Sequence, residues 1–332
     1  MTSRQRVMTM MPPTSDFNPW SGMHNMSSSN YYVSRRVDTS INPHQRDLHW
    51  SLNETGSPAL LIGYNPAEQA NEFKGIITGE DRQRHLLIIA LQDPAMREAF
   101  LKVCIDIITV LQDVAEQQQR HAVILRLERW AHFFQDKQTG LSNEGQKGLI
   151  AELTCLQDIV LRAFNSKAAL QSWTGPQQAV HDFSFGQTAI EVKSNRGSGT
   201  PNITMSSASQ LSVNEHESLF LYVVEVNQAT SLASGSTLTD YIWQTRKLLP
   251  SPLDALEFDL KLSQVGYEES DDYSGIFWST GSIRHFKVTE NFPHIDETLL
   301  NSAISEITYR VNLNHCGTFE ISKDTLLEGP RS

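Results

Sequence analysis

The chain has 332 residues, and its 38 Asp and Glu against 27 Lys and Arg give a formal charge of −11. This length accommodates one large or two ordinary domains, and 39% hydrophobic with 20% charged residues excludes a disordered or fibrous chain. Three scattered cysteines with no Cys-x-x-Cys pair exclude a disulfide-stapled secreted domain and a zinc ribbon. We therefore expect a folded protein of a reducing compartment.

The negative charge lies mainly in the C-terminal part. Residues 211–332 contain 18 acidic and 8 basic residues, a net charge of −10, whereas residues 1–210 contain 20 and 19, a net charge of −1. Nucleic-acid binding depends largely on Lys and Arg at phosphates, so an acidic total argues against it at first sight. Because the first 210 residues are almost neutral, the total charge excludes little.

Membrane insertion and export are not indicated by the sequence. The most apolar runs, Leu86–Leu91 and Val103–Leu111, are shorter than a membrane span. The first 16 residues contain no continuous apolar core of a signal peptide. We expect a cytoplasmic protein with no membrane contact.

The N-terminal part is predicted to contain a small module. Residues 1–40 are rich in Ser, Met, Asn and Pro, and we expect them to be largely unstructured or extended. Residues 41–140 are predicted to form a β-sheet followed by two amphipathic helices. The expected strands are Pro58–Tyr64, Lys74–Gly79 and Leu86–Leu91, and the expected helices are Pro94–Gln118 and His121–Asp136.

A second domain is predicted over residues 141–332. Ser142 is a candidate N-cap for a helix that runs to about Phe164, and helices and strands alternate after it. This mixed order predicts an α/β (α+β) domain with a central mixed sheet flanked by helices. Strands are expected at Ala179–Phe183, Thr188–Lys193, Leu219–Glu225 and after Gly275, and helices near Ser207–Val213, Thr237–Leu248 and Leu253–Leu262.

The most informative stretch is QQAVHDFSFGQTAIEVKSN. In its second strand, apolar residues alternate with Glu191 and Lys193, so the two charged side chains share one face. Gly186-Gln187 fits a two-residue type II′ turn. The turn would set Phe183 opposite Ile190, Asp182 opposite Glu191 and Val180 opposite Lys193.

Such a pair of carboxylates has a clear chemical use. Two acids across a strand pair repel each other unless a cation lies between them. Mg²⁺ suits this site because it takes a few carboxylate oxygens and completes its shell with water and phosphate. A lysine on the same face can stabilise a hydroxide or the charge that develops on phosphorus. The pattern therefore predicts a site for phosphodiester hydrolysis, with Mn²⁺ as a substitute metal.

The helix before this hairpin supplies a further acid. Glu152 lies three, four and seven residues from Leu149, Leu156 and Ile159, so its carboxylate falls on or beside the apolar face. A buried carboxylate needs compensation, which a metal or Lys193 would supply. We therefore include Glu152 among the candidate site residues.

The Asp/Glu-x-Lys pattern alone is weak, because the chain contains three copies of it. The copies at Glu72–Lys74 and Asp259–Lys261 lack the hairpin, and the last lies in a helical pattern where such residues are usually solvated. Only Glu191–Lys193 follows a hairpin-paired Asp and a helix with an inward Glu. The structural alternative is a surface hairpin in which Glu191 and Lys193 form an ordinary ion pair.

At this point the sequence resembles a known family. The runs LSNEGQKGLIAEL, WTGPQQAVHDFSFGQTAIEVKSN and ITMSSASQL are similar to the bacterial PD-(D/E)XK motif protein family, long catalogued as a domain of unknown function. The resemblance extends over most of the chain and implies a restriction-endonuclease-like core. It also implies a place in anti-phage defence islands, beside a helicase, a MutL-like ATPase and an abortive-infection protein.

The resemblance assigns roles to the site residues. It makes Asp182 and Glu191 the metal-binding carboxylates, Lys193 the catalytic lysine and Glu152 the helical acid of the core. The backbone carbonyl of Val192 is expected as a further metal ligand. His181 stands where the family motif usually has Pro, and its place on the apolar side of the strand favours a hydrogen-bonded core histidine over a general base.

Four other residues are weaker candidates for substrate or second-shell contacts. Ser207 and Gln210 match the family's Ser-Ser-x-x-Gln-Leu run, but they also fit a helix capping box, which we favour. In the alternative, Gln210 points towards the metal site. Asn195 and Arg196, just past the strand, are expected either to contact phosphate or to lie in a solvated loop.

Two function hypotheses follow. The first is a Mg²⁺-dependent DNA endonuclease subunit of a defence system that works with helicase and ATPase partners. The alternative is a non-catalytic nucleic-acid or protein-binding subunit with a nuclease-like fold. An RNase would use the same residues, and the sequence leaves substrate specificity and assembly into a homodimer open.

Overall fold

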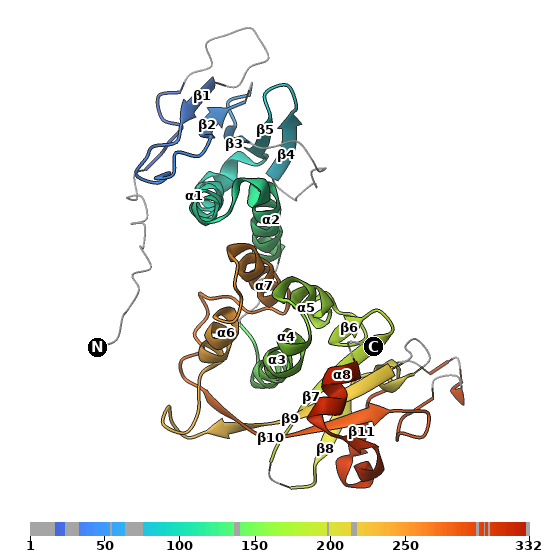
Figure 1. Ribbon diagram of the computed structural model, residues 1–332. Helices are drawn as coiled ribbons and strands as arrows, with labels where there is room; N and C mark the ends of the chain where they lie inside the picture. The colour runs from blue at the N-terminus through green and yellow to red at the C-terminus, as the bar shows by residue number, and fades with distance from the viewer. Residues whose placement is uncertain are drawn as a thin grey trace. The chain divides into compact units, whose positions relative to one another are not determined.

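The chain divides into two compact units, residues 1–135 and residues 136–332, which we describe separately. The computed structural model shows both as mixtures of helices and strands (Figure 1). The described residues are 17–23, 33–53, 55–63, 76–135, 140–197, 199–213, 218–296, 299–301, 303–304 and 306–329.

The first unit begins with an antiparallel sheet in the strand order β1-β2-β3-β5-β4. The strands β3 and β5 were predicted almost to the residue, and β4 begins two residues later than expected. The strands β1 and β2 were not predicted, although β1 falls in the segment expected to be largely unstructured or extended. The bounds are β1 Val33–Arg36, β2 Leu48–Leu52, β3 Pro58–Gly63, β4 Ile76–Asp81 and β5 Leu86–Leu91.

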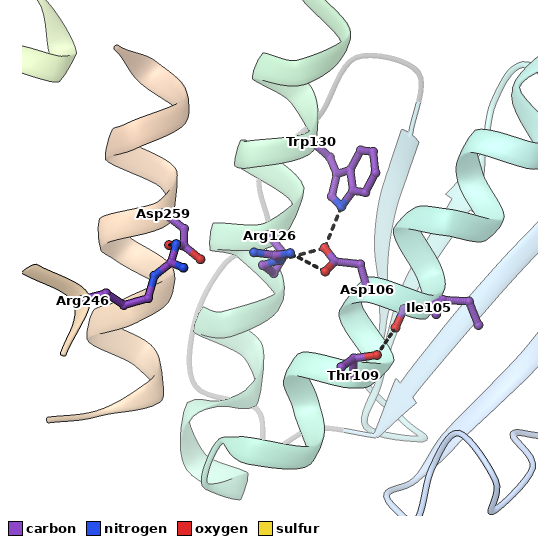
Figure 2. Close-up of polar contacts among 7 residues, drawn as sticks. All are labelled: Ile105, Asp106, Thr109, Arg126, Trp130, Arg246 and Asp259. Atoms are coloured by element: carbon purple, nitrogen blue, oxygen red, sulfur yellow. Dashed lines mark hydrogen bonds and ion pairs between the residues drawn. The ribbon is translucent and has the colours of Figure 1, made fainter. Parts of the chain in front are cut away.

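Two helices follow the sheet, α1 (Arg97–Asp113) and α2 (Gln119–Gln135), as the apolar periodicity predicted. A polar cluster between them centres on Asp106 of α1 (Figure 2). Its carboxylate forms a bidentate ion pair with Arg126 and accepts a hydrogen bond from the indole N–H of Trp130 at 2.8 Å. A planar guanidinium and a carboxylate match each other in this geometry, so the cluster fixes α2 against α1.

The second unit begins with α3 (Asn143–Cys155). The Ser142 hydroxyl accepts the Gly145 N–H at 3.2 Å, so the predicted N-cap is confirmed. The helix continues through a π-helical turn (Leu156–Val160) and a short α4 (Leu161–Ala163), close to the predicted end.

The central sheet of the second unit has five strands in the order β12-β10-β9-β7-β6. Strands β7 and β9 are parallel and the other neighbours are antiparallel, so the sheet is mixed, as predicted. A separate two-stranded ribbon pairs β8 with β11. The bounds are β6 Phe183–Phe185, β7 Thr188–Asn195, β8 Asn202–Met205, β9 Ser218–Ala229, β10 Phe277–Val288, β11 Tyr309–Asn312 and β12 Glu320–Ile321.

Both faces of this sheet are covered. Ile190 and Val192 of β7 belong to an apolar core with residues of α3 and three further helices. Ala189, on the opposite face, belongs to a second core with residues of β8 and β11. This alternation places Glu191 and Lys193 on the β8 face, as the period of two requires. The further helices are α5 (Ser166–Ser172), α6 (Leu238–Arg246) and α7 (Pro252–Gln264), and α8 (Lys323–Glu328) also packs here.

Two element predictions are wrong. Ala179–Phe183 is not a strand, because only Phe183 joins the sheet, at the start of β6. Ser207–Val213 is not an α-helix but holds a single 3₁₀ turn at Ser209–Leu211. The helices α6 and α7 lie where they were predicted, and an ion pair between Arg246 and Asp259 joins them (Figure 2). In the part of the chain that is described, none of the helices has the length and apolar character of a membrane span.

Candidate functional site

The site is built on the hairpin of β6 and β7. Gly186 has a φ of +60°, as the first central position of a type II′ turn requires, and Phe185 pairs with Thr188. The predicted pairing of Phe183 with Ile190 is also present. The turn thus sets the register that the sequence indicated.

Asp182 lies one residue before β6 and is held from two sides. Its carbonyl accepts the N–H groups of Thr174 and Gly175 at 2.8 and 3.0 Å. Its Oδ2 accepts the backbone N–H of Val192 at 2.7 Å. The β6–β7 pairing therefore ends at Phe183 and Ile190, so the predicted backbone pairing of Asp182 with Glu191 is not formed. The Asp182 carboxylate instead binds a backbone N–H at the edge of β7.

The same hydrogen bond locates the Val192 carbonyl. In a strand, the N–H and C=O of one residue point to the same side, since a hydrogen-bonded pair exchanges both. The Val192 N–H points towards Asp182, so its carbonyl faces the same edge of β7, beyond the last paired residue of β6. It therefore lies on the Asp182 side of β7.

Glu191 and Lys193 project together from the β8 face of β7. The Glu191 side chain is 1% exposed, and its Oε1 lies 2.6 Å from the Lys193 Nζ. Its Oε2 has no hydrogen-bond partner among the described residues. A buried, unpartnered carboxylate oxygen is costly, and it is the feature that a cation would stabilise.

Gln210 is brought to the lysine rather than into a capping box. Its Oε1 lies 3.3 Å from the Lys193 Nζ and also accepts the Ser206 N–H at 2.9 Å. Ser207 contacts the Ser209 hydroxyl at 2.9 Å, and the 3₁₀ turn has no side-chain cap. The predicted capping box between Ser207 and Gln210 is therefore wrong, because this segment forms a single 3₁₀ turn and not a helix.

Glu152 is oriented by a tryptophan that the sequence reasoning did not select. The Trp173 indole donates to the Glu152 Oε2 at 2.7 Å. The Trp173 carbonyl in turn accepts from the Lys261 Nζ at 2.6 Å. Lys261, expected to be solvated as part of a decoy motif, is buried and holds the segment before Asp182. The only sequence signal for this segment was the Trp-Thr-Gly-Pro run itself.

Gly175 lies between the two acids. A methyl group on its Cα would lie 2.9 Å from the Asp182 Oδ1 and 3.2 Å from the Glu152 Oε2. A side chain here would therefore displace a carboxylate, so a glycine allows both acids to approach this backbone.

The three carboxyl groups all have raised pKa values. Burial raises the pKa of Glu152 from 4.5 to about 8, and the charge of Asp182 adds to the rise. Burial also raises the pKa of Asp182, against the lowering effects of Lys193 and the Val192 N–H. The pKa of Glu191 lies well above its ordinary value, through burial and then the charge of Asp182, although Lys193 opposes the rise. Such clusters of perturbed acids are typical of functional sites.

A divalent metal fits these residues in a limited way. No group of three His, Cys, Asp or Glu side chains among the described residues is arranged to hold a metal. A metal would therefore use Asp182, the unpartnered Glu191 oxygen and the Val192 carbonyl, with water and phosphate oxygens for the rest, a ligand set that suits Mg²⁺.

The remaining candidates lie outside this cluster. Asn195 ends β7, and its buried Oδ1 has no hydrogen-bond partner in the described part of the chain. Arg196 is exposed and lies 3.5 Å from a Glu144 oxygen. His181 is buried, as expected of a core histidine. The decoy at residues 72–74 lies outside the described residues.

Comparison with protein families agrees with this geometry. Residues 17–314 match the model of the family DUF4420, which is described as "Putative PD-(D/E)XK family member". The chain belongs to this family. Its mixed α/β fold is consistent with a PD-(D/E)XK nuclease-like fold, and members usually use divalent metals. No curated protein and no solved structure matches the chain.

Proposed function

We propose that the second unit hydrolyses phosphodiester bonds of DNA in the presence of Mg²⁺. The observation that carries this proposal is the set of Asp182, Lys193 and the buried Glu191, one of whose carboxylate oxygens has no hydrogen-bond partner among the described residues. Membership of a PD-(D/E)XK family supports the same chemistry. The predicted roles of the residues thus remain as the sequence assigned them, with Mn²⁺ as the substitute metal.

Each residue has a task that its contacts explain. Asp182 is oriented by the Val192 N–H, which binds its Oδ2, and its Oδ1 would bind the metal. Lys193 is held between Glu191 and Gln210, from where its ammonium group can stabilise a hydroxide or the charge on the phosphate. Glu152 is fixed by Trp173. A bound Mg²⁺ would lower the pKa of water and polarise the phosphodiester.

The alternative is a non-catalytic nucleic-acid or protein-binding subunit. The observation in its favour is the Glu191–Lys193 ion pair, since the sequence alternative was an ordinary pair of these two residues. The burial of Glu191 at 1% exposure speaks against a surface pair. Ion pairs at the surface are common and cost little, whereas a buried one with an unpartnered oxygen requires compensation.

Cleavage assays on single-stranded and plasmid DNA, with RNA in parallel, separate the two functions. We expect cleavage by the wild type that depends on Mg²⁺ or Mn²⁺. In Asp182→Asn and in Lys193→Ala the cleavage rate should fall by roughly 100-fold or more, the usual contribution of one group that stabilises charge in the transition state. Glu290→Gln, at an exposed acid of the same unit, is the matched control. Cleavage that survives Asp182→Asn would reject the site, and cleavage of RNA alone would reject the DNA substrate.

We also propose that the protein works in the cytoplasm with helicase and MutL-like ATPase partners in anti-phage defence. The support is the family resemblance and the low number of basic residues, 27 in 332, which favours delivery of DNA by a partner. Co-purification with the products of neighbouring genes tests this proposal. Full activity of the isolated chain, unchanged by those products, would contradict it.

A further inference from the structure

A polar cavity lies next to the candidate site, at the end of β7. It has a volume of about 410 Å³ and is lined by residues of α3, of β7 and the loop after it, and of the β8–β11 ribbon. Three of its lining residues are cations, Lys147, Arg196 and Arg310, and we call it the basic cavity. Because Ser194, which directly follows Lys193, also lines it, the basic cavity adjoins the lysine of the candidate site.

The cations of the basic cavity outnumber its acids. Glu144 is the one acidic residue that lines it, and its Oε1 lies 2.6 Å from the Lys147 Nζ and 3.5 Å from Arg196. The carboxylate of Glu225, opposite Asn195 on β9, accepts the Ser282 N–H at 2.8 Å and does not line the cavity. Two positive charges therefore remain in excess, which excludes a metal cation and favours an anion.

Lys147 makes this a built site rather than a chance group of surface side chains. Its side chain is 8% exposed, and its Nζ lies 5.7 Å from the centre of the Trp278 ring. Burying an ammonium group is costly unless it is paired, and the Glu144 carboxylate pairs with this one at 2.6 Å. An anion in the cavity would supply a second partner.

Arg310 and its neighbours add donors with suitable geometry. Arg310 on β11 pairs with Thr204 on β8, so the guanidinium and the hydroxyl lie on one face of the ribbon. At the end of β7, the Asn195 amide also lines the cavity, and its NH₂ group is the part that can donate to an anion. A planar guanidinium with hydroxyl and amide groups is a typical phosphate-binding set.

The distance to Lys193 identifies the ligand more closely. Asn195 lies two residues beyond Lys193, which is about 6–7 Å along a strand. This is similar to the separation of neighbouring phosphates in a nucleic-acid strand. A strand with one phosphodiester at the acids would therefore bring its next phosphate to the basic cavity.

We propose that the basic cavity binds a backbone phosphate of a nucleic-acid strand, next to the phosphodiester that is cleaved. This inference rests on the proposed function, since it uses the position of Lys193 to fix the register of the strand. It names Lys147, Arg196 and Arg310 as substrate-binding residues rather than catalytic residues, because none of them contacts the acids that would hold the metal.

Binding of a fluorescent single-stranded oligonucleotide to the full chain in EDTA tests the proposal without cleavage. We expect Arg310→Gln to bind about ten- to a hundredfold more weakly, as the loss of one charge-assisted contact predicts. The slope of log affinity against log salt should fall by about 0.7, the value for one phosphate contact to a single strand. Arg162→Gln removes another exposed arginine, which does not line the cavity, and should leave both values unchanged.

Two further measurements identify the ligand. Inorganic phosphate at millimolar concentration should weaken oligonucleotide binding in the wild type more than in Arg310→Gln. Polyglutamate of equal charge should compete no better than chloride at the same ionic strength. If it competes as well as DNA, the cavity binds acidic peptides and the proposal is wrong.

The outcomes also separate this proposal from that of nuclease activity. With Mg²⁺, Arg310→Gln should raise the KM for cleavage and leave kcat unchanged, because it removes binding that is equal in the ground and transition states. If the wild type cleaves nothing but Arg310→Gln weakens binding, the nuclease proposal fails and the basic cavity stands. If the wild type cleaves and Arg310→Gln changes neither KM nor affinity, the basic cavity is rejected and the nuclease proposal stands.

Discussion

Glu152→Gln should make the protein more stable at alkaline pH. The buried carboxyl lies near Asp182 and accepts the Trp173 indole N–H at 2.7 Å. A glutamine keeps an oxygen for this hydrogen bond and has the same size, but it carries no charge at any pH. The substitution therefore isolates the cost of ionising one acid in this site.

The size and sign follow from the raised pKa. Between 4.5 and about 8 the folded protein keeps a proton on Glu152 that the unfolded chain releases. The free energy of unfolding therefore falls as pH rises, by about 1.4 kcal/mol per pH unit. The full interval of about 3.5 pH units corresponds to about 5 kcal/mol as an upper bound. Water entry and sharing of protons with Asp182 reduce this, and we expect about 2–3 kcal/mol between pH 5 and pH 8.

Urea denaturation in EDTA, followed by tryptophan fluorescence at pH 5 to 9, measures the effect. Wild type and Glu152→Gln should be similar near pH 5 and diverge above it, with the variant more stable. Glu290→Gln, at an exposed acid, should follow the wild type. Equal pH dependence in wild type and Glu152→Gln would show that Glu152 ionises freely in the folded state and would refute the reasoning.

Three other substitutions test separate parts of the structure. Gly175→Ala should cost about 1–3 kcal/mol in thermal denaturation and lower kcat for DNA cleavage, because the added methyl displaces the Asp182 carboxylate. Gln210→Ala should lower kcat about tenfold, since it removes the hydrogen bond to Lys193, the proposed catalytic lysine, and should lower the melting temperature slightly, since the Ser206 N–H loses its acceptor; single-turnover kinetics measure the first effect. Asp106→Asn should weaken the first unit by about 1–3 kcal/mol in calorimetry, because Arg126 loses its charged partner, while cleavage per folded molecule stays constant.

Local patterns in the sequence were sufficient for the hairpin and for the helix start. The glycine at 186 and the alternation along Thr188–Lys193 set both the register and the shared face of Glu191 and Lys193. The cap at Ser142 was equally clear, because an N-cap hydroxyl acts on backbone atoms only three residues away. These features depend on neighbours in the chain, which a single sequence displays.

Features that depend on distant residues were missed. The strand expected up to Phe183 is absent because the amides of Thr174 and Gly175 take the Asp182 carbonyl, so the segment bends before β6. Lys261 reaches the Trp173 carbonyl across 88 residues of sequence, a contact that no local period indicates. Tertiary contacts of this kind override local propensity.

The charge of −11 is therefore a poor guide to what this protein binds. Burial raises the pKa of Glu152 to about 8, so this acid keeps its proton at neutral pH and adds no negative charge to the folded state. At the end of the same strand, the basic cavity concentrates three cations around one carboxylate. The potential that a phosphate meets at this edge of the sheet is set by the groups within about one Debye length, and the distant acids of residues 211–332 contribute little.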